Sequence, residues 1–273
     1  MTAGGGRSLS QAWAGLWNVA GGLPYHVQAW RFRRRLWGPY RAQVAAVLAE
    51  WAPPQTELVI VGPSAGWNLP PAFLARFAAV TAVEPDPLAT WLLRRRFPGV
   101  HWQIDSDDYF TPAGPRPWRE NLDRLFARYP TEALLFSGFL GQLVGLYPDA
   151  VATEGPSGAC ETAAFGRWKA HLRAHLLSRS YCTLHDRWVS AAPPLLPGPL
   201  ALTAAGTVDA DGPPPLALWA QQEPAVDPFT AGLTPQAPQR LLVWQRLPRR
   251  WHVMAAVWQN TGAVAGPEAG TGE

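Results

Sequence analysis

Residues 58–66 read Leu-Val-Ile-Val-Gly-Pro-Ser-Ala-Gly, and this stretch decides the fold. The apolar run 58–61 has the length of a strand, and an uninterrupted apolar run is typical of a strand buried on both faces of a parallel sheet. The glycine-bracketed segment 62–66 follows at once. Glycine permits a tight turn and a close approach of the backbone to a ligand. The stretch therefore predicts a buried strand that ends in a tight turn.

Strand-like and helical patterns alternate after this turn. The predicted helices lie at about residues 70–79, 87–96, 119–127 and 165–176, and the predicted strands at residues 80–83, 100–104, 133–136 and 181–189. In the second of these helices we expect Leu88, Trp91 and Leu92 to face inward. This alternation predicts an α/β fold with a parallel sheet and right-handed crossover connections.

The chain before the first strand has a different character. Its first 49 residues contain no acidic residue. Five apolar or aromatic positions then recur at the spacing of one helix face, namely Tyr40, Val44, Val47, Leu48 and Trp51. A preceding helix is predicted from about Pro24 to Trp37, because proline suits a helix start and Gly38-Pro39 interrupts the run. We therefore expect an N-terminal helical extension over residues 1–54.

The last third of the chain contains an insertion and a hairpin. Residues 193–238 hold eleven prolines and no basic residue, which predicts an extended, Pro-rich insertion or cap. The apolar runs 241–244 and 251–258 flank Leu247-Pro248-Arg249-Arg250 and predict an antiparallel hairpin. We expect the main domain to span residues 55–260 and the Gly/Ala-rich tail, residues 261–273, to be disordered.

Composition narrows the class of protein. The 273 residues suit one large domain or two small ones, and the net charge of +3 is far from that of a dedicated polyanion-binding protein. Two cysteines, Cys160 and Cys182, make neither a disulfide framework nor a zinc cluster. No apolar run reaches the 18 or more residues of a membrane span, and no secretory signal is visible. We therefore expect a cytoplasmic protein.

The strongest functional pattern joins the turn to an acidic residue. Glu84 ends the next predicted strand, 22 residues after Gly62. The helix after such a turn offers free N–H groups to an anion, and an acid at the next strand end can accept both hydroxyls of a ribose. The pattern predicts a nucleotide-type cofactor site. A plain crossover unit, whose glycines serve packing alone, remains the alternative.

The turn itself distinguishes between two kinds of cofactor. The dinucleotide fingerprint G-x-G-x-x-G is not matched, because the turn provides Gly62, Ser64 and Gly66 and no glycine follows at Asn68. The chain instead resembles the class I S-adenosylmethionine-dependent methyltransferases, whose first motif is a G-x-G-x-G turn. The resemblance covers roughly Leu58 to Phe136 and the closing hairpin. It implies a Rossmann-like, mostly parallel sheet with helices on both faces and a terminal antiparallel hairpin.

The resemblance also implies site residues. Gly62, Ser64 and Gly66 would surround the methionine part of S-adenosylmethionine. Glu84 would hold its ribose. Asp105 or Asp107, which follow the third predicted strand, would face the amino group of its adenine.

The chain departs from the family at several places, among them the turn and the end of the fourth predicted strand. Ser64 replaces the middle glycine of the turn. The fourth predicted strand continues into Ser137-Gly138-Phe139, where base and amide N-methyltransferases carry an Asp/Asn-Pro-Pro-aromatic signature. A catalytically degenerate member that serves in binding or assembly is therefore an alternative hypothesis.

The same turn matches a second catalytic motif. Gly62-Pro63-Ser64-Ala65-Gly66 fits the G-x-S-x-G nucleophile elbow of serine hydrolases, with Asp186 or Asp227 and His252 as possible partners of Ser64. That fold requires several strands before the elbow, whereas mostly helical sequence precedes residue 58. It also gives Glu84 no role, so this hypothesis ranks third.

Few other side chains suggest chemistry. His185 and Asp186, on the fifth predicted strand, form a candidate general base. His171 and His175 have a helical spacing that can bind metal, but the sequence shows no third ligand beside them, so we expect no metal site.

The methyl acceptor is expected to be a small molecule or another unidentified compound. The arginine run Arg31, Arg33, Arg34 and Arg35 lies among aromatic residues and suggests RNA as a possible partner, whereas a solvated helix face is the simpler interpretation. The sequence leaves the oligomeric state open.

Overall fold

The computed structural model describes residues 22–110, 118–138, 140, 151–153, 159–161, 163–194, 225–226, 234 and 239–261. Most of the Pro-rich segment 193–238 and the tail beyond residue 261 lie outside the described residues, so the predicted cap and disordered tail are not addressed by the structure. Within the described residues, no helix is long and apolar enough to cross a membrane.

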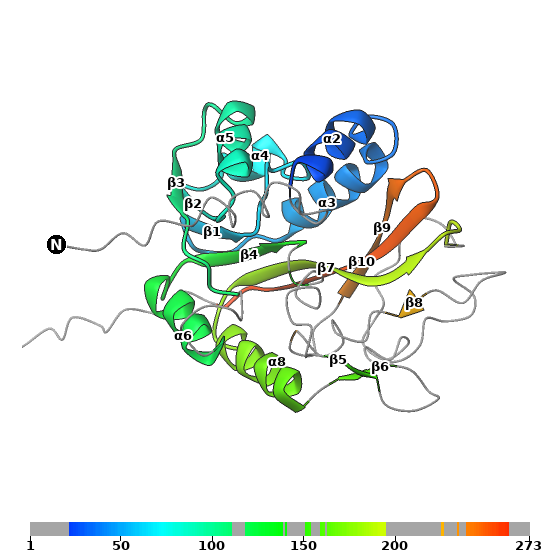
Figure 1. The fold of residues 1–273 in the computed structure, drawn as a ribbon. Coiled ribbons are helices and arrows are strands. Elements are labelled where there is room, and N and C mark those ends of the chain that lie inside the picture. The colour runs from blue at the N-terminus through cyan, green and yellow to red at the C-terminus, as the bar shows by residue number, and fades with distance from the viewer. Residues whose placement is uncertain are drawn as a thin grey trace, which may run out of the picture.

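One large, mostly parallel sheet forms the centre of the molecule (Figure 1). Its strands are β1 (Glu57–Val61), β2 (Ala79–Val83), β3 (Trp102–Asp105), β4 (Ala133–Ser137), β7 (Tyr181–Ser190), β8 (Ala225–Val226), β9 (Gln239–Leu247) and β10 (Arg250–Gln259). The order is β3-β2-β1-β4-β7-β10-β9, with β8 paired to β7. Strands β3, β2, β1, β4 and β7 run parallel, whereas β10 is antiparallel to both β7 and β9. The last strand of the hairpin is thus inserted beside β7, which confirms the predicted Rossmann-like sheet with a terminal antiparallel hairpin.

Helices cover both faces of this sheet. They are α2 (Leu23–Phe32), α3 (Gly38–Glu50), α4 (Pro71–Leu74), α5 (Pro87–Arg96), α6 (Trp118–Arg128) and α8 (Ala163–Leu176). Figure 1 shows α2 to α5 on one side and α6 with α8 on the other. Two short strands, β5 (Val151–Thr153) and β6 (Ala159–Glu161), form a separate hairpin that the sequence did not predict.

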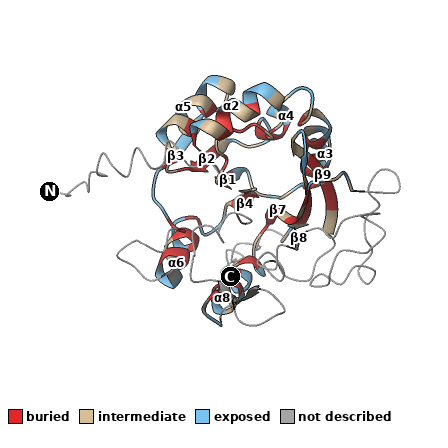
Figure 2. Cartoon of the chain, turned by 45° about the vertical axis from the view of Figure 1, so that its right-hand side comes forward, coloured by how far each residue is buried: buried red, intermediate tan, exposed pale blue. Residues whose placement is uncertain are grey.

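The central strand β1 shows why the sheet is buried on both sides. Leu58 and Ile60 pack into the apolar cluster that also holds residues of α2 to α5, whereas Val59 and Val61 join the cluster beneath α6 and α8. Alternate residues of a strand point to opposite faces. A continuous apolar run is therefore what a two-sided sheet requires, and Figure 2 shows the strands buried between partly exposed helices.

Helix α3 protects the sheet edge at β9. The side-chain amide of Gln43 donates to the carbonyl of Val243 and accepts from its N–H, at 3.3 and 3.0 Å. This side chain satisfies backbone groups that an edge strand would otherwise expose. The Trp37 Nε1–H also donates to the carbonyl of Arg246 at 3.0 Å. All five residues predicted on the inward face of this helix region, 40–51, are buried.

Three local predictions were wrong. Helix α2 ends at Phe32 rather than Trp37, because the chain bends there and places the Trp37 ring in the core. The helix predicted at about residues 70–79 is α4 and already ends at Leu74. The chain turns back there, so that the N–H of Ala78, just before β2, donates to the carbonyl of Thr56. Trp91 faces outward.

The buried face of α5 carries residues smaller than tryptophan. Ala89 and Leu93 are buried, whereas Trp91 is 53% exposed and lies under the guanidinium of Arg95. The helix approaches the turn after β1 so closely that Gly66 lies against Leu93. The bulky tryptophan would prevent this approach, so it occupies the solvent side.

Candidate functional site

The turn after β1 adopts the unusual backbone that its sequence suggested. Gly62, Ser64 and Gly66 have φ angles of 65°, 51° and 64°. A Cβ atom added to Gly66 would lie 2.7 Å from the ring of Phe97 and 2.8 Å from the side chain of Leu93. Gly66 is therefore required both by the left-handed backbone and by the packing of α5. Ser64 adopts this conformation in spite of its Cβ, which is uncommon and concentrates at functional sites.

Glu84 lies directly against this turn. Its carboxylate accepts the backbone N–H of Ser64 at 2.9 Å and the N–H of Asp86 at 3.1 Å. The side chain is buried, and burial raises its pKa from 4.5 to about 7, although the two backbone hydrogen bonds oppose the shift. The structure thus brings together the turn and the acid that the sequence paired only by spacing.

Several buried polar atoms around the turn have no protein partner. Among the described residues, they include Ser64 Oγ, Asn68 Oδ1 and Asp86 Oδ2. Asp86 Oδ2 lies 3.9 Å from His26 Nε2, which also lacks a hydrogen bond. Buried polar atoms are seldom left unpaired, because their desolvation costs free energy. Ser64 and Asp86 are also the two residues whose N–H groups bond Glu84, so their unpaired oxygens fit a polar ligand at this end of the sheet.

Trp67, directly after the turn, contacts helix α2. Its indole Nε1–H donates to His26 Nδ1 at 3.1 Å, and the guanidinium of Arg96 lies 3.9 Å from the centre of its ring. Burial, followed by the nearby charges of Arg41 and Arg33, lowers the pKa of Arg96 to about 10. Trp67, the tryptophan that sequence position placed nearest the turn, is thus a buried contact between α2 and the turn.

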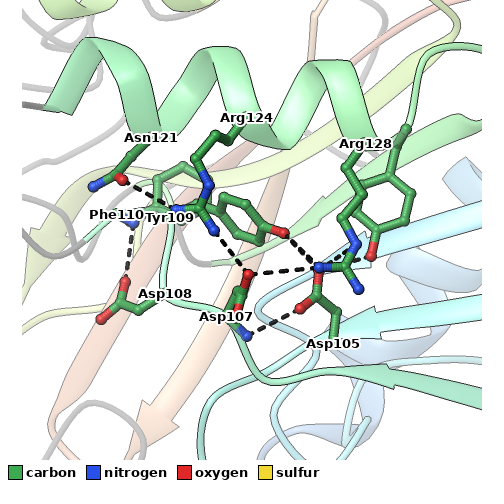
Figure 3. Close-up of polar contacts among 9 residues, drawn as sticks. Asp105, Asp107, Asp108, Tyr109, Phe110, Asn121, Arg124 and Arg128 are labelled. Carbon is green, nitrogen blue, oxygen red and sulfur yellow. Dashed lines mark hydrogen bonds and ion pairs between the residues drawn. The ribbon is translucent and has the colours of Figure 1, made fainter. Parts of the chain in front are cut away.

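Asp105 and Asp107, the two predicted adenine ligands, contact α6 (Figure 3). Asp105 Oδ2 accepts the hydroxyls of Tyr109 and Tyr129 at 2.8 and 2.7 Å, and its Oδ1 accepts the N–H of Asp107 at 3.0 Å. Asp107 Oδ2 pairs with Arg124 at 2.8 Å. Asp105 is buried, whereas the side chain of Asp107 is 48% exposed. Asp107 is therefore the more accessible of the two.

A hydrogen-bonded acid and histidine lie at the carboxyl end of the parallel strands, farther across the sheet from Glu84. Asp186 Oδ1 and His252 Nδ1 are 2.7 Å apart, joining neighbouring strands β7 and β10. Strand β4 ends its pairing at Ser137, opposite Leu184, so the following residues of β7 project beyond it at the carboxyl end. The pairing register shifts between Val253 and Met254, and such bulges are over-represented beside active sites.

The tautomer of His252 follows from its partners. When Asp186 is ionised, His252 Nδ1 carries the proton that is donated to it. Nε2 then holds a lone pair, and this atom is buried without a hydrogen bond. The pair thus presents a nitrogen that can accept a proton. From the sequence, His252 was a candidate only as a partner of Ser64.

His185, the histidine predicted to act with Asp186, has other surroundings. Its Nδ1 lies 3.1 Å from Thr183 Oγ1, and the residue is buried. Burial, followed by the charge of Arg187, lowers the pKa of His185 to about 3. Such a group stays neutral at physiological pH, and it is a poorer candidate base than His252.

Helix α2 connects the two halves of the site. Burial raises the pKa of Tyr25 to about 12; Arg246 and Arg96 lower this pKa, while Glu84 and Asp186 raise it. Both carboxylates therefore act electrostatically on one buried tyrosine. The ring of Tyr25 itself contacts His26 and Trp37.

The arrangement gives no support to the serine hydrolase hypothesis. Ser64 Oγ and His252 Nε2 each lack a hydrogen-bond partner, so they do not bond each other as nucleophile and base. In the described part of the chain before β1, residues 22–56, the regular elements are α2 and α3 and no strand occurs. The several strands that precede a nucleophile elbow in that fold are missing from this segment.

The fold is that of the class I methyltransferase-like proteins, because β10 enters antiparallel between β7 and β9 of a Rossmann-like sheet and an acid at the end of β2 meets the turn after β1. No protein-family model and no curated protein matches the chain.

Three methyltransferases are among the solved structures with a partly similar course of the chain. The N-methyltransferase NodS from Bradyrhizobium japonicum WM9, in complex with S-adenosyl-L-homocysteine, is 10% identical, with a TM-score of 0.40 over 91% of this chain and 97% of NodS. The amino pentose methyltransferase CalS10 from Micromonospora echinaspora, with bound SAM, is 22% identical, with a TM-score of 0.32 over 60% of this chain and 56% of CalS10. The 23S rRNA methyltransferase ErmE is 18% identical, with a TM-score of 0.31 over 54% of this chain. The chain spans 46% of the length of ErmE.

Proposed function

We propose that this protein is an S-adenosylmethionine-dependent methyltransferase. The observation that carries the proposal is the hydrogen bond from the Ser64 N–H to the Glu84 carboxylate, which joins the glycine turn to the acid at the end of β2. In the class I family that the sequence resembles, these two features hold adjacent parts of one cofactor, its methionine and its ribose. The unpaired polar atoms beside Glu84 fit the same ligand.

The residues at the turn have separate roles in this proposal. The left-handed backbone at Gly62, Ser64 and Gly66 faces the methionine part of the cofactor. Glu84 accepts the ribose hydroxyls once its carboxylate leaves the Ser64 N–H. Asp107, half-exposed at the end of β3, faces the adenine, whereas Asp105 is held in place by two tyrosines.

The acceptor reacts at the Asp186–His252 pair. S-adenosylmethionine supplies an electrophilic methyl group when it is bound. A protonated acceptor nucleophile must lose its proton during transfer, and His252 Nε2 can take it. Asp186 fixes the ring tautomer and stabilises the imidazolium that forms. The pair is a positioned base of the kind that contributes about 10²- to 10⁴-fold to rate.

Helix α2 belongs to the N-terminal extension proposed for residues 1–54, and its Tyr25 and His26 are buried. His26 contacts Trp67 directly after the turn, so this helix borders the proposed cofactor site. A small molecule is the first candidate for the acceptor. RNA is a second candidate, because Trp30 is exposed beside Arg31 and near Arg34 on the outer surface of the same helix region.

Cofactor binding is the direct test. Calorimetric titration of the full chain with S-adenosylmethionine and S-adenosylhomocysteine should show one site, and Glu84→Ala should weaken it by about 10²-fold, because two charge-assisted ribose hydrogen bonds are lost. Glu57→Ala is a matched control, since Glu57 is an exposed glutamate at the opposite end of β1. Absence of binding at millimolar cofactor would refute the proposal.

Transfer of the methyl group distinguishes an enzyme from a degenerate binding protein. The chain is incubated with methyl-labelled cofactor and either a small-metabolite extract or total RNA, and the labelled product is isolated. Label in one fraction that is lost in His252→Gln identifies the acceptor class and supports the base. Cofactor binding without any transfer would favour the degenerate alternative.

A further inference from the structure

Three potential metal ligands meet between α6 and α8, on the sheet face opposite α2 to α5 (Figure 1). His171 Nε2 and His175 Nε2 lie 2.8 and 2.9 Å from the same oxygen, Asp123 Oδ1. The cluster is independent of the Glu84 and His252 sites, whose side chains lie on the opposite side of the molecule's core. Asp123 precedes His171 by 48 residues, so the local spacing of the sequence does not reveal it as the third ligand.

The two helices fix the positions of these groups. Residues four apart on a helix share one face, so His171 and His175 both point from α8 toward α6. The helices themselves are anchored by buried apolar neighbours of the cluster, Leu122 on α6 and Leu172 on α8. The donor atoms therefore converge because of the fold.

The imidazole rings are also held in orientation. His175 stacks on Phe126 with ring centres 4.2 Å apart and planes at 11°. His171 meets His175 edge to face at 4.8 Å and 82°. Both rings present Nε2 to the carboxylate, which is the arrangement in which one ion can bind both nitrogens and one oxygen.

Asp123 is open to solvent. Its side chain is 49% exposed, so an ion can reach the carboxylate from outside the helix pair.

We infer that Asp123, His171 and His175 form a binding site for a divalent transition metal, of which zinc is the best match, and that the ion cross-links α6 to α8. Imidazole nitrogen and carboxylate oxygen are preferred zinc ligands, at bond lengths of about 2.0–2.2 Å. At tetrahedral angles, two ligands at such distances lie about 3.3 Å apart. The observed N···O separations of 2.8 and 2.9 Å need to open by a few tenths of an ångström, and all three ligand atoms already lie within 4.8 Å of one another, so the two Nε2 atoms reach the ion by small side-chain movements.

Zinc titration tests the site directly. An untagged, chelator-treated full chain is titrated with zinc chloride by calorimetry, and its melting temperature is measured with and without zinc. We expect one equivalent to bind and to raise the melting temperature, because a ligand specific for the native state stabilises it. Cobalt(II), used as a spectroscopic probe, should show the intense visible bands of a tetrahedral site.

Variants assign the ligands. His171→Gln, His175→Gln and Asp123→Asn should each weaken zinc binding at least tenfold and remove the zinc-dependent rise in melting temperature. His101→Gln is the control, since His101 is an exposed histidine outside the cluster. Metal-free melting temperatures and circular dichroism establish that each variant folds.

Three outcomes would overturn the inference. They are failure of the native chain to bind zinc at submillimolar concentration, binding that survives in His171→Gln and Asp123→Asn, and binding that leaves the melting temperature unchanged. The cofactor titration is unaffected by any of these results, so the metal site and the proposed methyltransferase activity are tested separately.

Discussion

Asp186 and His252 face each other across β7 and β10, with 2.7 Å between Oδ1 and Nδ1. Both side chains are mostly covered, with 16% and 4% of their surfaces exposed. The acid is thus the partner of a histidine that is close in space and 66 residues away in sequence. The pair is a buried polar contact whose loss should be measurable in the absence of any substrate.

Asp186→Ala should lower the free energy of unfolding by about 1–3 kcal/mol, because the buried N–H of His252 would lose its acceptor. Asp186→Asn retains an oxygen at the same place and should cost less. Urea denaturation of the two variants measures the difference, with Glu57→Ala as an exposed control. If the alanine and asparagine variants were equally unstable, the hydrogen bond to His252 would not be the source of the loss.

The pH dependence of stability should report on Glu84. Its pKa is about 7 in the folded chain and 4.5 in the unfolded chain, so between these values the folded state binds more protons than the unfolded state. The contribution of Glu84 to stability is therefore fully present below pH 4.5 and is lost as pH rises through 7. The shift corresponds to roughly 3 kcal/mol.

Glu84→Gln removes this titration. Relative to the native chain, the variant should gain stability by up to roughly 3 kcal/mol between pH 4.5 and pH 8, on top of a constant cost from its altered hydrogen bonds. Urea denaturation across this range gives the difference curve, in which the other titrating groups cancel. A flat difference curve would show that Glu84 has an ordinary pKa.

The sequence predicted best what depends on local pattern. The turn at 62–66 and the acid at Glu84 were found because strand, turn, strand and acid follow one another within 30 residues and each leaves its own signal. The parallel sheet followed from the same alternation. These features need no knowledge of how distant segments pack.

Features that depend on packing were missed. The pairing of Asp186 with His252 depends on the register of two antiparallel strands and on a bulge, neither of which periodicity specifies. His185 looked like the natural partner of its neighbour, yet adjacent strand residues point to opposite faces. Trp91 was expected to face inward together with Leu88 and Leu92, but it is 53% exposed, and its size excludes it from the face that meets Gly66.

The same close approach makes Gly66 sensitive to substitution. Gly66→Ala should destabilise the protein by about 2–4 kcal/mol, since a left-handed alanine costs about 1–2 kcal/mol and overpacking against Phe97 and Leu93 adds at least 1. It should also weaken cofactor binding by distorting the turn. Gly99→Ala is the control, because a Cβ there meets no atom within 4 Å. Equal stability of the two variants would contradict the tight packing.

The Asp105 network should behave as one unit. Tyr109 and Tyr129 both donate to Asp105 Oδ2, so Tyr129→Phe should cost about 1.5–3 kcal/mol, the range for a hydrogen bond to a charged group. The double variant Tyr109→Phe/Tyr129→Phe should cost more than the sum of the single changes, because the first loss leaves one hydroxyl at that buried oxygen, whereas the second leaves only the guanidinium of Arg128 at 3.5 Å. A double-mutant cycle by urea denaturation measures this coupling, expected at 0.5 kcal/mol or more. Strict additivity would mean that the two hydroxyls stabilise Asp105 independently. Water would then reach the carboxylate, and Asp105 would again be a candidate for contact with adenine.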